Sequence, residues 1–506
     1  MNDYDVIVIG AGISGLVAGL KVALEGYKVL ILEKNNDCLG YNKTFVKGRF
    51  SFDTSYTPLG LYDMTNKSGY LNKVFDELKI ADDLKLVRLP EAFRVITDDG
   101  SGKDFTLPFG IERFIKRMEE YFPGSTKYLT PFFDLASECR EALKYIDEKD
   151  GLVDQDYMKE NYDNFVRIAS YSVSKVMDAL GIPLEIQEVL NVFWLLFGST
   201  ETELSFVTYA ASFYDYIDLG LYIPVHKTSE ILYKLLDRYL ENHGEIKYNC
   251  EVKKIMTTYG EVNAVMVNDG TIYYTNHLIA NISPNTLVSQ MVNPEELNDK
   301  ALRFCNQRKL GMREVKVYLG LNRSIEELGI KNYSYYLYNS LDSDVEYSKM
   351  GLIGENNDVL VQCINKVYPN ASLEGTSIVT LTSYFSTNVF ESSVSLDNYY
   401  SESERIASRM IDLFSKKIGV NISDYIEEIE ILTPVSFALR TNNQINGYKL
   451  EGLDNVLPRL LTASKELIFK GLRFGGAYSY YGATSEALYL AGMKSAWYTI
   501  KDIEGE

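Results

Sequence analysis

The first part of the chain alternates short apolar runs with an amphipathic stretch. Residues 5–10 read DVIVIG, a nearly unbroken apolar run rich in β-branched side chains. Such a run is typical of a strand buried on both faces of a parallel sheet. Residues 16–27 (LVAGLKVALEGY) then show helical periodicity, and the glycine near their end is a helix C-cap signal. Because a second apolar run, KVLILEK (28–34), follows, the pattern predicts a strand, a helix and a second strand in that order.

The hydrophobic pattern changes twice further along the chain. Residues 66–220 are mostly helical by pattern and rich in aromatic side chains. Residues 245–284 predict a set of short strands joined by turns. Residues 286–454 mix apolar strands with a long amphipathic helix at 401–419, and we expect a further strand over 426–440 (IEEIEILTPVSFALR). Since 506 residues exceed what one hydrophobic core usually covers, we expect two interleaved structural regions.

Glycines fill the turn between the first strand and the first helix. Gly10, Gly12 and Gly15 fit the pattern G-x-G-x-x-G, which permits a tight turn, a close approach to a pyrophosphate and close helix–strand packing. The N-terminus of the helix then offers free N–H groups and partial positive charge to phosphates. Glu33 ends the second strand, where a carboxylate accepts the hydroxyls of an adenosine ribose and disfavours a 2′-phosphate. The spacing of all these parts predicts a dinucleotide-binding fold.

Composition and charge narrow the classes of partner. Lys and Arg number 51 and Asp and Glu 70, which gives a net charge of −19. Such an acidic chain is unsuited to nucleic acid or to anionic lipid, although an apolar membrane contact is not excluded. The five cysteines form no C-x-x-C pair and the three histidines no zinc-binding pattern, so we expect neither a disulfide framework nor a metal. The start MNDYDVIVIG lacks the basic residues of a signal peptide, and no apolar run reaches the roughly 18 residues of a membrane span. We therefore expect a cytoplasmic protein that makes at most a peripheral membrane contact.

The segment after Glu33 separates FAD from NAD. It reads EKNNDCLGYNKTFVKGRFSFD (33–53) and resembles the corresponding segment of the phytoene desaturase, carotenoid isomerase and retinol saturase family, within the flavin amine oxidase superfamily. In that family the segment wraps the pyrophosphate and flavin of FAD. Glycine is replaced by Leu39 and Ser55, and at Pro224-Val225-His226-Lys227 the family has Pro-x-Gly-Gly; these losses predict weaker flavin binding.

The C-terminal stretch GGAYSYYGATSEALYLAG (475–492) resembles the closing flavin motif of the same superfamily. Ala477 stands where the motif has aspartate, and the helix that follows would point its N–H groups at the flavin or phosphates. No cysteine follows Cys363, so we expect FAD to be held non-covalently. The resemblance assigns Tyr480 and Tyr481 to the flavin face as candidate catalytic residues, although packing of a sheet–helix joint explains them equally well. The expected cofactor-binding residues are Gly10, Ala11, Gly12, Ser14, Gly15, Glu33, Lys34, Gly40, Lys43, Thr44, Val252, Gly476, Ala477, Thr484, Ser485 and Glu486.

The expected fold class is therefore α/β. It combines a glutathione-reductase-type FAD-binding Rossmann domain with an interleaved substrate domain made of a mixed sheet and a helical cap. The boundaries we expect are 1–65, 221–285 and 455–506 for the FAD-binding domain, and 66–220 and 286–454 for the substrate-binding domain.

The resemblance implies an FAD-dependent oxidoreductase acting on CH–CH bonds. Hydride would pass between flavin N5 and a carbon of an apolar, polyene-type small molecule or lipid, with desaturation, saturation or isomerisation as the outcome. Two alternatives stay open. One is a flavin amine oxidase acting on a C–N bond, and the other is a non-catalytic lipid-binding protein of the dissociation-inhibitor type. The sequence leaves the oligomeric state open.

Overall fold

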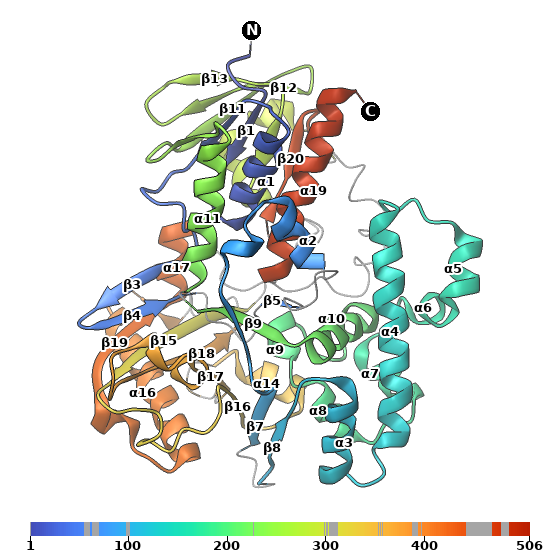
Figure 1. The fold of residues 1–506 in the computed structure, drawn as a ribbon, viewed down its shortest axis with the longest axis vertical. Helices are drawn as coiled ribbons and strands as arrows, with labels where there is room; N and C mark the ends of the chain where they lie inside the picture. Colours follow the sequence, from blue (N-terminus) through green and yellow to red (C-terminus); the bar gives the residue numbers. More distant parts are fainter. Residues whose placement is uncertain are drawn as a thin grey trace.

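The computed structural model describes most of the chain. The described residues are 2–54, 61–62, 70–97, 102–225, 227–297, 299, 302, 312–352, 354, 356, 358–386, 393–395, 397–441, 468–476 and 485–505. In Figure 1 both ends of the chain lie at the top of the molecule, beside the first strand and the last helix. The predicted α/β class is confirmed, with mixed sheets and helices throughout.

A five-stranded parallel sheet forms the upper part of the molecule. Its strand order is β10-β2-β1-β14-β20, so that the first strand of the chain lies in the middle. The five strands come from three distant parts of the sequence, and each part lies within one of the three predicted segments of the FAD-binding domain. The exact boundaries of that domain stay a prediction. The strands are β1 (Val6–Ile9), β2 (Val29–Leu32), β10 (Glu245–Lys247), β14 (Leu278–Ala280) and β20 (Leu472–Phe474).

The two faces of this sheet are covered differently, because successive side chains of a strand point to opposite sides. Val6 and Val8 pack in one core with three helices, whereas Ile7 and Ile9 pack in another with a three-stranded meander. Figure 1 shows the helices side by side in front of the sheet. They are α1 (Ile13–Leu24), α11 (Thr228–Glu241) and α19 (Ser485–Glu504), and the meander is β11 (Val252–Thr258), β12 (Glu261–Val267) and β13 (Ile272–Tyr274).

A seven-stranded mixed sheet forms the lower part, in the order β19-β15-β18-β17-β16-β7-β8. All neighbours are antiparallel except β16 and β7, which are parallel. One face packs against the long helix α16 (Tyr399–Ile418). The strands are β7 (Phe93–Thr97), β8 (Asp104–Leu107), β15 (Arg313–Leu321), β16 (Ser334–Tyr338), β17 (Val359–Cys363), β18 (Ser377–Phe385) and β19 (Ile426–Leu432).

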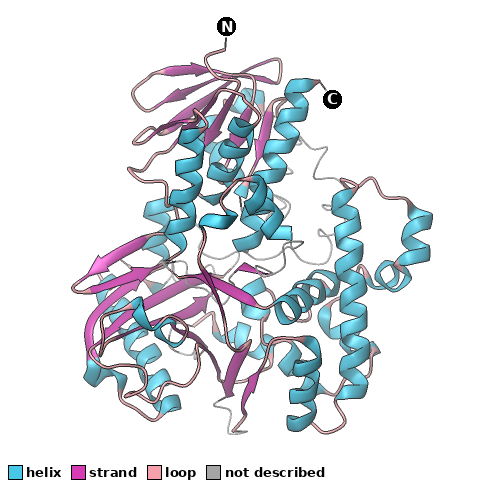
Figure 2. Ribbon diagram, viewed as in Figure 1, coloured by secondary structure: helices cyan, strands magenta, loops and turns pink. Residues whose placement is uncertain are grey.

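The other face of this sheet packs against a cap of helices, coloured cyan in Figure 2 at the right of the molecule. Phe and Tyr rings dominate this core, with Phe93, Phe193 and Tyr336 in mutual edge contacts. The cap contains α3 (Ile111–Tyr121), α4 (Thr126–Glu148), α5 (Gln155–Asn161), α6 (Asp163–Ile168), α7 (Val173–Ala179), α8 (Leu184–Leu190), α9 (Trp194–Phe197) and α10 (Phe206–Leu219).

Short elements connect the two parts. The hairpin β3 (Thr44–Lys47) and β4 (Phe50–Asp53) lies between them, and β9 (Leu221–Pro224) pairs with both β5 (Leu61–Tyr62) and β6 (Leu86–Arg88). Helix α2 (Tyr70–Glu77) packs on α19, where the ring of Phe75 meets that of Tyr489. Among the helices of the described residues, none is both long and apolar enough to cross a bilayer.

Candidate functional site

The turn from β1 into α1 has the geometry that the glycine motif predicts. Gly10 has a φ of +93°, and a Cβ at this position would lie 3.0 Å from the carbonyl oxygen of Asn281. A Cβ at Gly15 would overlap the carbonyl oxygen of Gly10. Gly12 is the residue at which α1 begins. Gly10 is therefore required by its backbone conformation and Gly15 by the close approach of the chain.

The N-terminus of α1 is open to an anion. Its N-cap, Gly12, supplies no side-chain hydrogen bond, and the first turn carries no acidic residue. The partial positive charge of the helix end is therefore not neutralised by the helix itself. This is the arrangement by which proteins hold a pyrophosphate.

Glu33 lies at the end of β2, next to this turn, and is 5% exposed. Its Oε2 accepts a hydrogen bond from the backbone N–H of Ala11 at 2.8 Å. Its Oε1 accepts from the backbone N and the side-chain Nδ2 of Asn35 at 2.8 and 2.9 Å. Because a carboxylate oxygen can accept two hydrogen bonds, Oε2 keeps one acceptor position. The role of Glu33 toward a ribose stays a prediction.

Asn281 joins the two ends of the site, and the sequence analysis did not include it among the candidate residues. Its Nδ2 would lie 3.2 Å from a Cβ at Gly12, and its Oδ1 would overlap a Cβ at Gly476. Gly476 itself has a φ of +74°. The N-terminal and C-terminal glycines therefore lie against the same side chain. Only the Asn-x-Ser-Pro pattern at 281–284 signalled Asn281 in advance.

The segment after β2 passes close to the helix end. Gly40 has a φ of +53°, and a Cβ there would lie 3.5 Å from the Cα of Gly12. Leu39, by contrast, is not among the residues with positive φ, and its side chain is buried in the core of α1 and α11. The expectation that Leu39 weakens the site because a glycine conformation is lost there is therefore wrong. The left-handed position is Gly40, which is still glycine.

The hairpin β3–β4 and the start of α11 are held together by four polar contacts. Thr44 Oγ1 and Ser229 Oγ share a hydrogen bond of 2.7 Å, and the N–H of Thr228 donates to Asp53 Oδ2 at 2.7 Å. Lys227 Nζ donates to both the carbonyl and the hydroxyl oxygen of Ser51. Burial lowers the pKa of Lys227, while the nearby carboxylate of Asp53 acts in the opposite direction.

Several predicted site residues have other contacts. Ser14 Oγ donates to the carbonyl oxygen of Leu488 at 2.6 Å, which ties α1 to α19. Lys43 donates its backbone N–H to Thr54 Oγ1 at 2.8 Å. Burial lowers the pKa of Lys34, and the carboxylate of Glu33 opposes this shift. Val252 is buried at the start of β11, next to an irregularity in its pairing with β12.

The remaining predicted residues belong to the C-terminal motif. Ala477, Tyr480, Tyr481 and Thr484 lie outside the described residues, as does Ser55. Ser485 and Glu486 begin α19. A carboxylate in the first turn of a helix is stabilised by the positive end of the helix dipole, which is the position of Glu486.

A buried ion pair faces the hairpin from the seven-stranded sheet. Lys316 is 0% exposed, and its Nζ lies 3.5 Å from Glu314 Oε1 and donates to the carbonyl oxygen of Thr54 at 3.0 Å. The same Nζ donates to the hydroxyl of Tyr41 at 3.2 Å. Burial raises the pKa of Glu314, and the charge of Lys316 opposes that shift. The sequence does not reveal this pair, because nothing in the alternation of β15 marks these two polar side chains as buried.

These observations test whether the site fits an FAD-type cofactor. The free N-terminus of α1, the glycines that leave room around it and the buried carboxylate of Glu33 are the groups that a dinucleotide requires. They fit. Among the described residues, no group of three His, Cys, Asp or Glu side chains could hold a metal ion.

Comparison with known proteins agrees with this site. The family model of the NAD(P)-binding Rossmann-like domain matches residues 8–78. The chain is 25% identical over 360 residues to the inactive all-trans-retinol 13,14-reductase of Danio rerio, covering 68% of this chain and 59% of that protein. It is 23% identical to the all-trans-retinol 13,14-reductase of Rattus norvegicus (67% and 57% covered) and 22% identical to a 4,4'-diapophytoene desaturase of Methylomonas sp (64% and 62% covered). The match thus spans less than two thirds of the length of each of these relatives.

Solved structures agree on the fold. Putrescine oxidase bound to putrescine superposes with a TM-score of 0.68 at 13% identity, over 99% of both chains. Rab GDI from Plasmodium falciparum superposes with a TM-score of 0.53 at 12% identity, over 100% of this chain. The chain is thus similar in sequence to retinol reductases and carotenoid desaturases, and it shares its fold with amine oxidases. The predicted resemblance is confirmed.

Proposed function

We propose that this protein is an FAD-dependent oxidoreductase that acts on a carbon–carbon bond of an extended, apolar, polyene-type substrate. The proposed outcome is desaturation, saturation or isomerisation. The names of its relatives support this proposal, since they include retinol reductases and a diapophytoene desaturase.

The observation that carries the proposal is the position of the hairpin β3–β4. Thr44 and Asp53 of the hairpin form hydrogen bonds with the start of α11. The hairpin follows shortly after Gly40, which lies against the N-terminal end of α1 at the cofactor site. On the other side, the rings of Phe45 and Phe52 meet that of Tyr318 on the seven-stranded sheet, with centroids 5.4 and 5.9 Å apart. One hairpin therefore contacts both the cofactor-binding elements and a buried aromatic sheet face.

When bound, FAD supplies a hydride acceptor or donor at flavin N5. The residues of the chain bind and orient the two partners and exclude water. Aromatic side chains suit an apolar substrate, because they bury large apolar areas in defined orientations. The cation of Lys316 lies at the same boundary, where it holds the carbonyl group of Thr54 in place. We propose that Tyr480 and Tyr481 line the flavin face.

Non-covalent attachment of FAD is part of the proposal. The chain has no cysteine after Cys363, and Cys363 is buried in the core on α16. We expect acid precipitation of the purified protein to leave all its flavin in the supernatant. Flavin that stays with the precipitated chain contradicts this part of the proposal.

The function is tested in two steps. The purified protein is first examined for the visible absorbance of oxidised flavin, and the released cofactor is identified by chromatography. The FAD-loaded protein is then mixed anaerobically with polyene substrates, and loss of the flavin absorbance is followed together with mass spectrometry of the polyene. A change of two hydrogens or of double-bond geometry in the polyene supports the proposal. Reduction of flavin by amines, with release of hydrogen peroxide in air, favours the amine oxidase instead.

A second candidate function is a non-catalytic lipid-binding protein. Two observations favour it: one relative is named as inactive, and the fold superposes on Rab GDI over the whole chain. Lys227 also stands in place of a motif glycine. A colourless protein that neither contains nor binds FAD, and that co-purifies with lipid, would favour this candidate.

We also propose a peripheral membrane contact through the helical cap. Leu152, just before α5, is 64% exposed, and Val166 on α6 is 42% exposed. Figure 1 shows α5 and α6 projecting from the side of the molecule. Because the net charge is −19, we expect co-sedimentation with neutral phosphatidylcholine vesicles rather than with anionic ones.

A further inference from the structure

A row of polar side chains crosses the seven-stranded sheet. In the register of the strands, Ser334 of β16 lies opposite Gln362 of β17, and Gln362 lies opposite Thr380 of β18. Thr380 in turn lies opposite Tyr318 of β15. Residues directly opposite one another share one face of a sheet. Four neighbouring strands thus present a continuous polar row on one face.

The face in question is the one covered by the helical cap. The neighbours of Gln362 in the strand, Val361 and Cys363, pack in the core on α16. Leu360 packs instead in the aromatic core together with Trp194 of the cap. Since side chains alternate along a strand, Gln362 points to the side of the aromatic core.

Several polar atoms on this side have no hydrogen-bond partner among the described residues. They are both Nε2 and Oε1 of Gln362, Oγ of Ser334 and Oγ1 of Thr382, together with the hydroxyl of Tyr333 just before β16. These side chains are at most 3% exposed. Buried polar groups are almost always paired, because burial without a partner sacrifices the hydrogen bonds that water supplied. These groups are therefore available to a ligand that forms hydrogen bonds on this face.

We propose that this row, centred on Gln362, binds the polar end of the substrate. This inference rests on the proposed function. The amide of Gln362 offers an NH₂ group that donates and an oxygen that accepts side by side, and hydroxyls surround it. The matching ligand group both donates and accepts, as a hydroxyl or carboxamide does. A carboxylate only accepts and an ammonium only donates, so neither fits as well.

The row leads from Gln362 toward the cofactor-binding elements. Its last member, Tyr318, packs on Phe45 and Phe52, and its hydroxyl lies 3.5 Å from the carbonyl oxygen of Thr54. Adjacent strands are about 4.8 Å apart, so two strand steps separate Gln362 from Tyr318 by about 10 Å. The row thus spans about 10 Å between the proposed site for the polar end and the hairpin beside the cofactor-binding elements, which suits an amphipathic polyene.

The test compares two ligands in the FAD-loaded protein. One is all-trans-retinol, and the other is the hydrocarbon in which hydrogen replaces its hydroxyl group. Binding is measured by quenching of tryptophan fluorescence, since Trp194 lies in the same core. We expect the wild type to prefer the alcohol at least tenfold, which corresponds to about 1.4 kcal/mol, and Gln362→Leu to reduce this preference to less than threefold. A wild type that binds both ligands equally or neither, or a preference that survives in Gln362→Leu, overturns the inference.

A matched control separates ligand binding from a structural role. Ser383 lies on the other face of the same sheet and accepts a hydrogen bond from Asn356 Nδ2 at 3.2 Å. We expect Ser383→Ala to lower the thermal midpoint and to keep the preference for the alcohol. Gln362→Leu should leave the midpoint of the ligand-free protein unchanged or raise it. A lower midpoint in Gln362→Leu, or a crystal structure with only ordered water on Gln362 in the presence of the alcohol, overturns the inference.

The proposed function and this inference can be contradicted independently of one another. A protein that prefers the alcohol through Gln362 but never changes the redox state or geometry of a polyene keeps this inference and loses the function. A protein that converts polyenes without any preference between the end groups keeps the function and loses this inference.

Discussion

At the scale of single residues, Lys227 keeps a glycine conformation without being glycine. Its φ is +99° and its ψ 157°, a region that is essentially confined to glycine. Residues held there carry of the order of 1–3 kcal/mol of strain. The two hydrogen bonds from Lys227 Nζ to Ser51 hold the side chain in place. The backbone at position 227 thus keeps the conformation of the motif glycine, although the residue is lysine.

This strain predicts an inverted order of stability for two substitutions at position 227. Lys227→Ala and Lys227→Gly both remove the contact with Ser51, but only glycine also relieves the backbone. We expect Lys227→Gly to be more stable than Lys227→Ala by about 1 kcal/mol, whereas glycine is ordinarily the less stable by 0.5–1 kcal/mol in regular elements. Urea unfolding of the two variants measures the difference. An alanine variant as stable as the glycine variant contradicts the prediction.

Gly15 lies in the first turn of α1 and Gly26 just after its last turn, so that the same substitution can be compared at the two ends of the helix. A Cβ at Gly15 would overlap the carbonyl oxygen of Gly10, whereas no atom lies within 4 Å of a Cβ at Gly26, where φ is +88°. We therefore expect Gly15→Ala to abolish FAD binding and to destabilise the fold by more than about 2 kcal/mol. Gly26→Ala should cost about 1 kcal/mol and retain FAD. Flavin content and urea midpoints check both, and a Gly15→Ala protein with a full complement of flavin refutes the expectation.

The sequence predicted the glycines of the site because their spacing is local. Gly10, Gly12 and Gly15 belong to one turn, and their roles follow from a known pattern. Asn281 and Lys316 were missed because their partners lie far away in the sequence, at Gly10 and at Thr54. The expectation that a glycine conformation is lost at Leu39 was wrong because the positive φ falls on Gly40, and the sequence does not reveal which of two adjacent residues takes that value.

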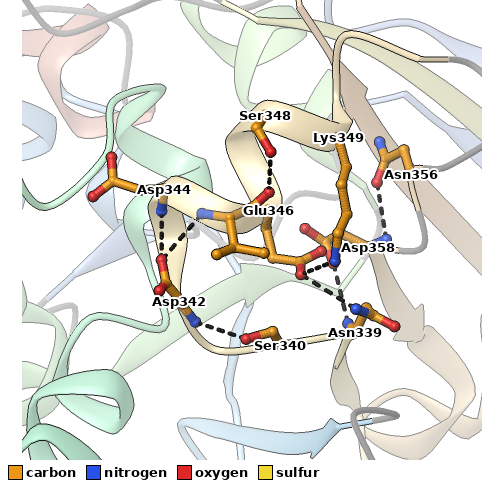
Figure 3. A network of polar contacts seen from close by, with 10 residues as sticks. Asn339, Ser340, Asp342, Asp344, Glu346, Ser348, Lys349, Asn356 and Asp358 are labelled. Atoms are coloured by element: carbon orange, nitrogen blue, oxygen red, sulfur yellow. Dashed lines mark hydrogen bonds and ion pairs between the residues drawn. The ribbon is translucent and has the colours of Figure 1, made fainter.

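At the scale of elements, helix α14 (Ser343–Lys349) meets the start of β17 through a pair of buried carboxyl groups. Glu346 and Asp358 are each 1% exposed, and Figure 3 shows Lys349 reaching toward Glu346 from the same helix. Lys349 Nζ lies 2.8 Å from Glu346 Oε1. Burial raises the pKa of Asp358 well above its usual value, and the charge of Glu346 and a hydrogen bond with it raise it further. Asp358 therefore holds its proton more strongly in the folded protein than in the unfolded chain.

The pair predicts a loss of stability as the pH rises. Because the pKa of Asp358 is raised on folding, its contribution is fully present below the unfolded value of about 3.9 and declines as pH rises toward the folded pKa. Asp358→Asn replaces the carboxyl group with an amide that does not titrate. Position 358 can then no longer carry a negative charge beside Glu346. We expect the variant to lose this part of the pH dependence and to be more stable than the wild type at pH 8.

Urea midpoints at pH 5 and pH 8 measure the difference between wild type and Asp358→Asn. The control is Asp237→Asn, which changes an exposed carboxylate on α11 and should keep the slope of the wild type. A parallel pH dependence in wild type and Asp358→Asn would show that the buried pair holds no extra proton.

The element boundaries show where the hydrophobic pattern is enough to predict a helix or a strand. The long helix predicted at 401–419 is α16 (Tyr399–Ile418), because its apolar face repeats at helical spacing against the sheet. The strand expected over 426–440 was wrong beyond Leu432, since α17 (Pro434–Thr441) begins there. Thr433 and Ser436 exchange hydrogen bonds at this helix start. Thr-Pro followed by serine is a start signal for a helix, but the alternating apolar residues around it favoured the prediction of a strand.

At the scale of the whole molecule, the cofactor site unites segments from both ends of the chain. Ser14 of α1 bonds to Leu488 of α19, and Gly492 permits close packing because a Cβ there would lie 2.7 Å from the carbonyl oxygen of Ser14. Lys494 of α19 lies 2.8 Å from Asp150 and 3.2 Å from Asp147, next to the helical cap. The same last helix therefore contacts the first helix of the chain and the cap. A ligand that binds this site stabilises the packing of all three.

The last prediction follows from this connection between site and fold. A ligand that binds only the folded state stabilises it by about 2.7 kcal/mol at 100 times its dissociation constant. We expect FAD to raise the thermal midpoint of the flavin-free protein. FMN at the same concentration should have little effect, because it lacks the pyrophosphate and adenosine that the end of α1 and Glu33 are placed to bind. Differential scanning fluorimetry with both ligands measures this, and Gly15→Ala should respond to neither. An equal response to FMN and FAD would mean that the flavin ring alone carries the affinity, and that the glycine-lined helix end is a remnant of the fold rather than part of a working site.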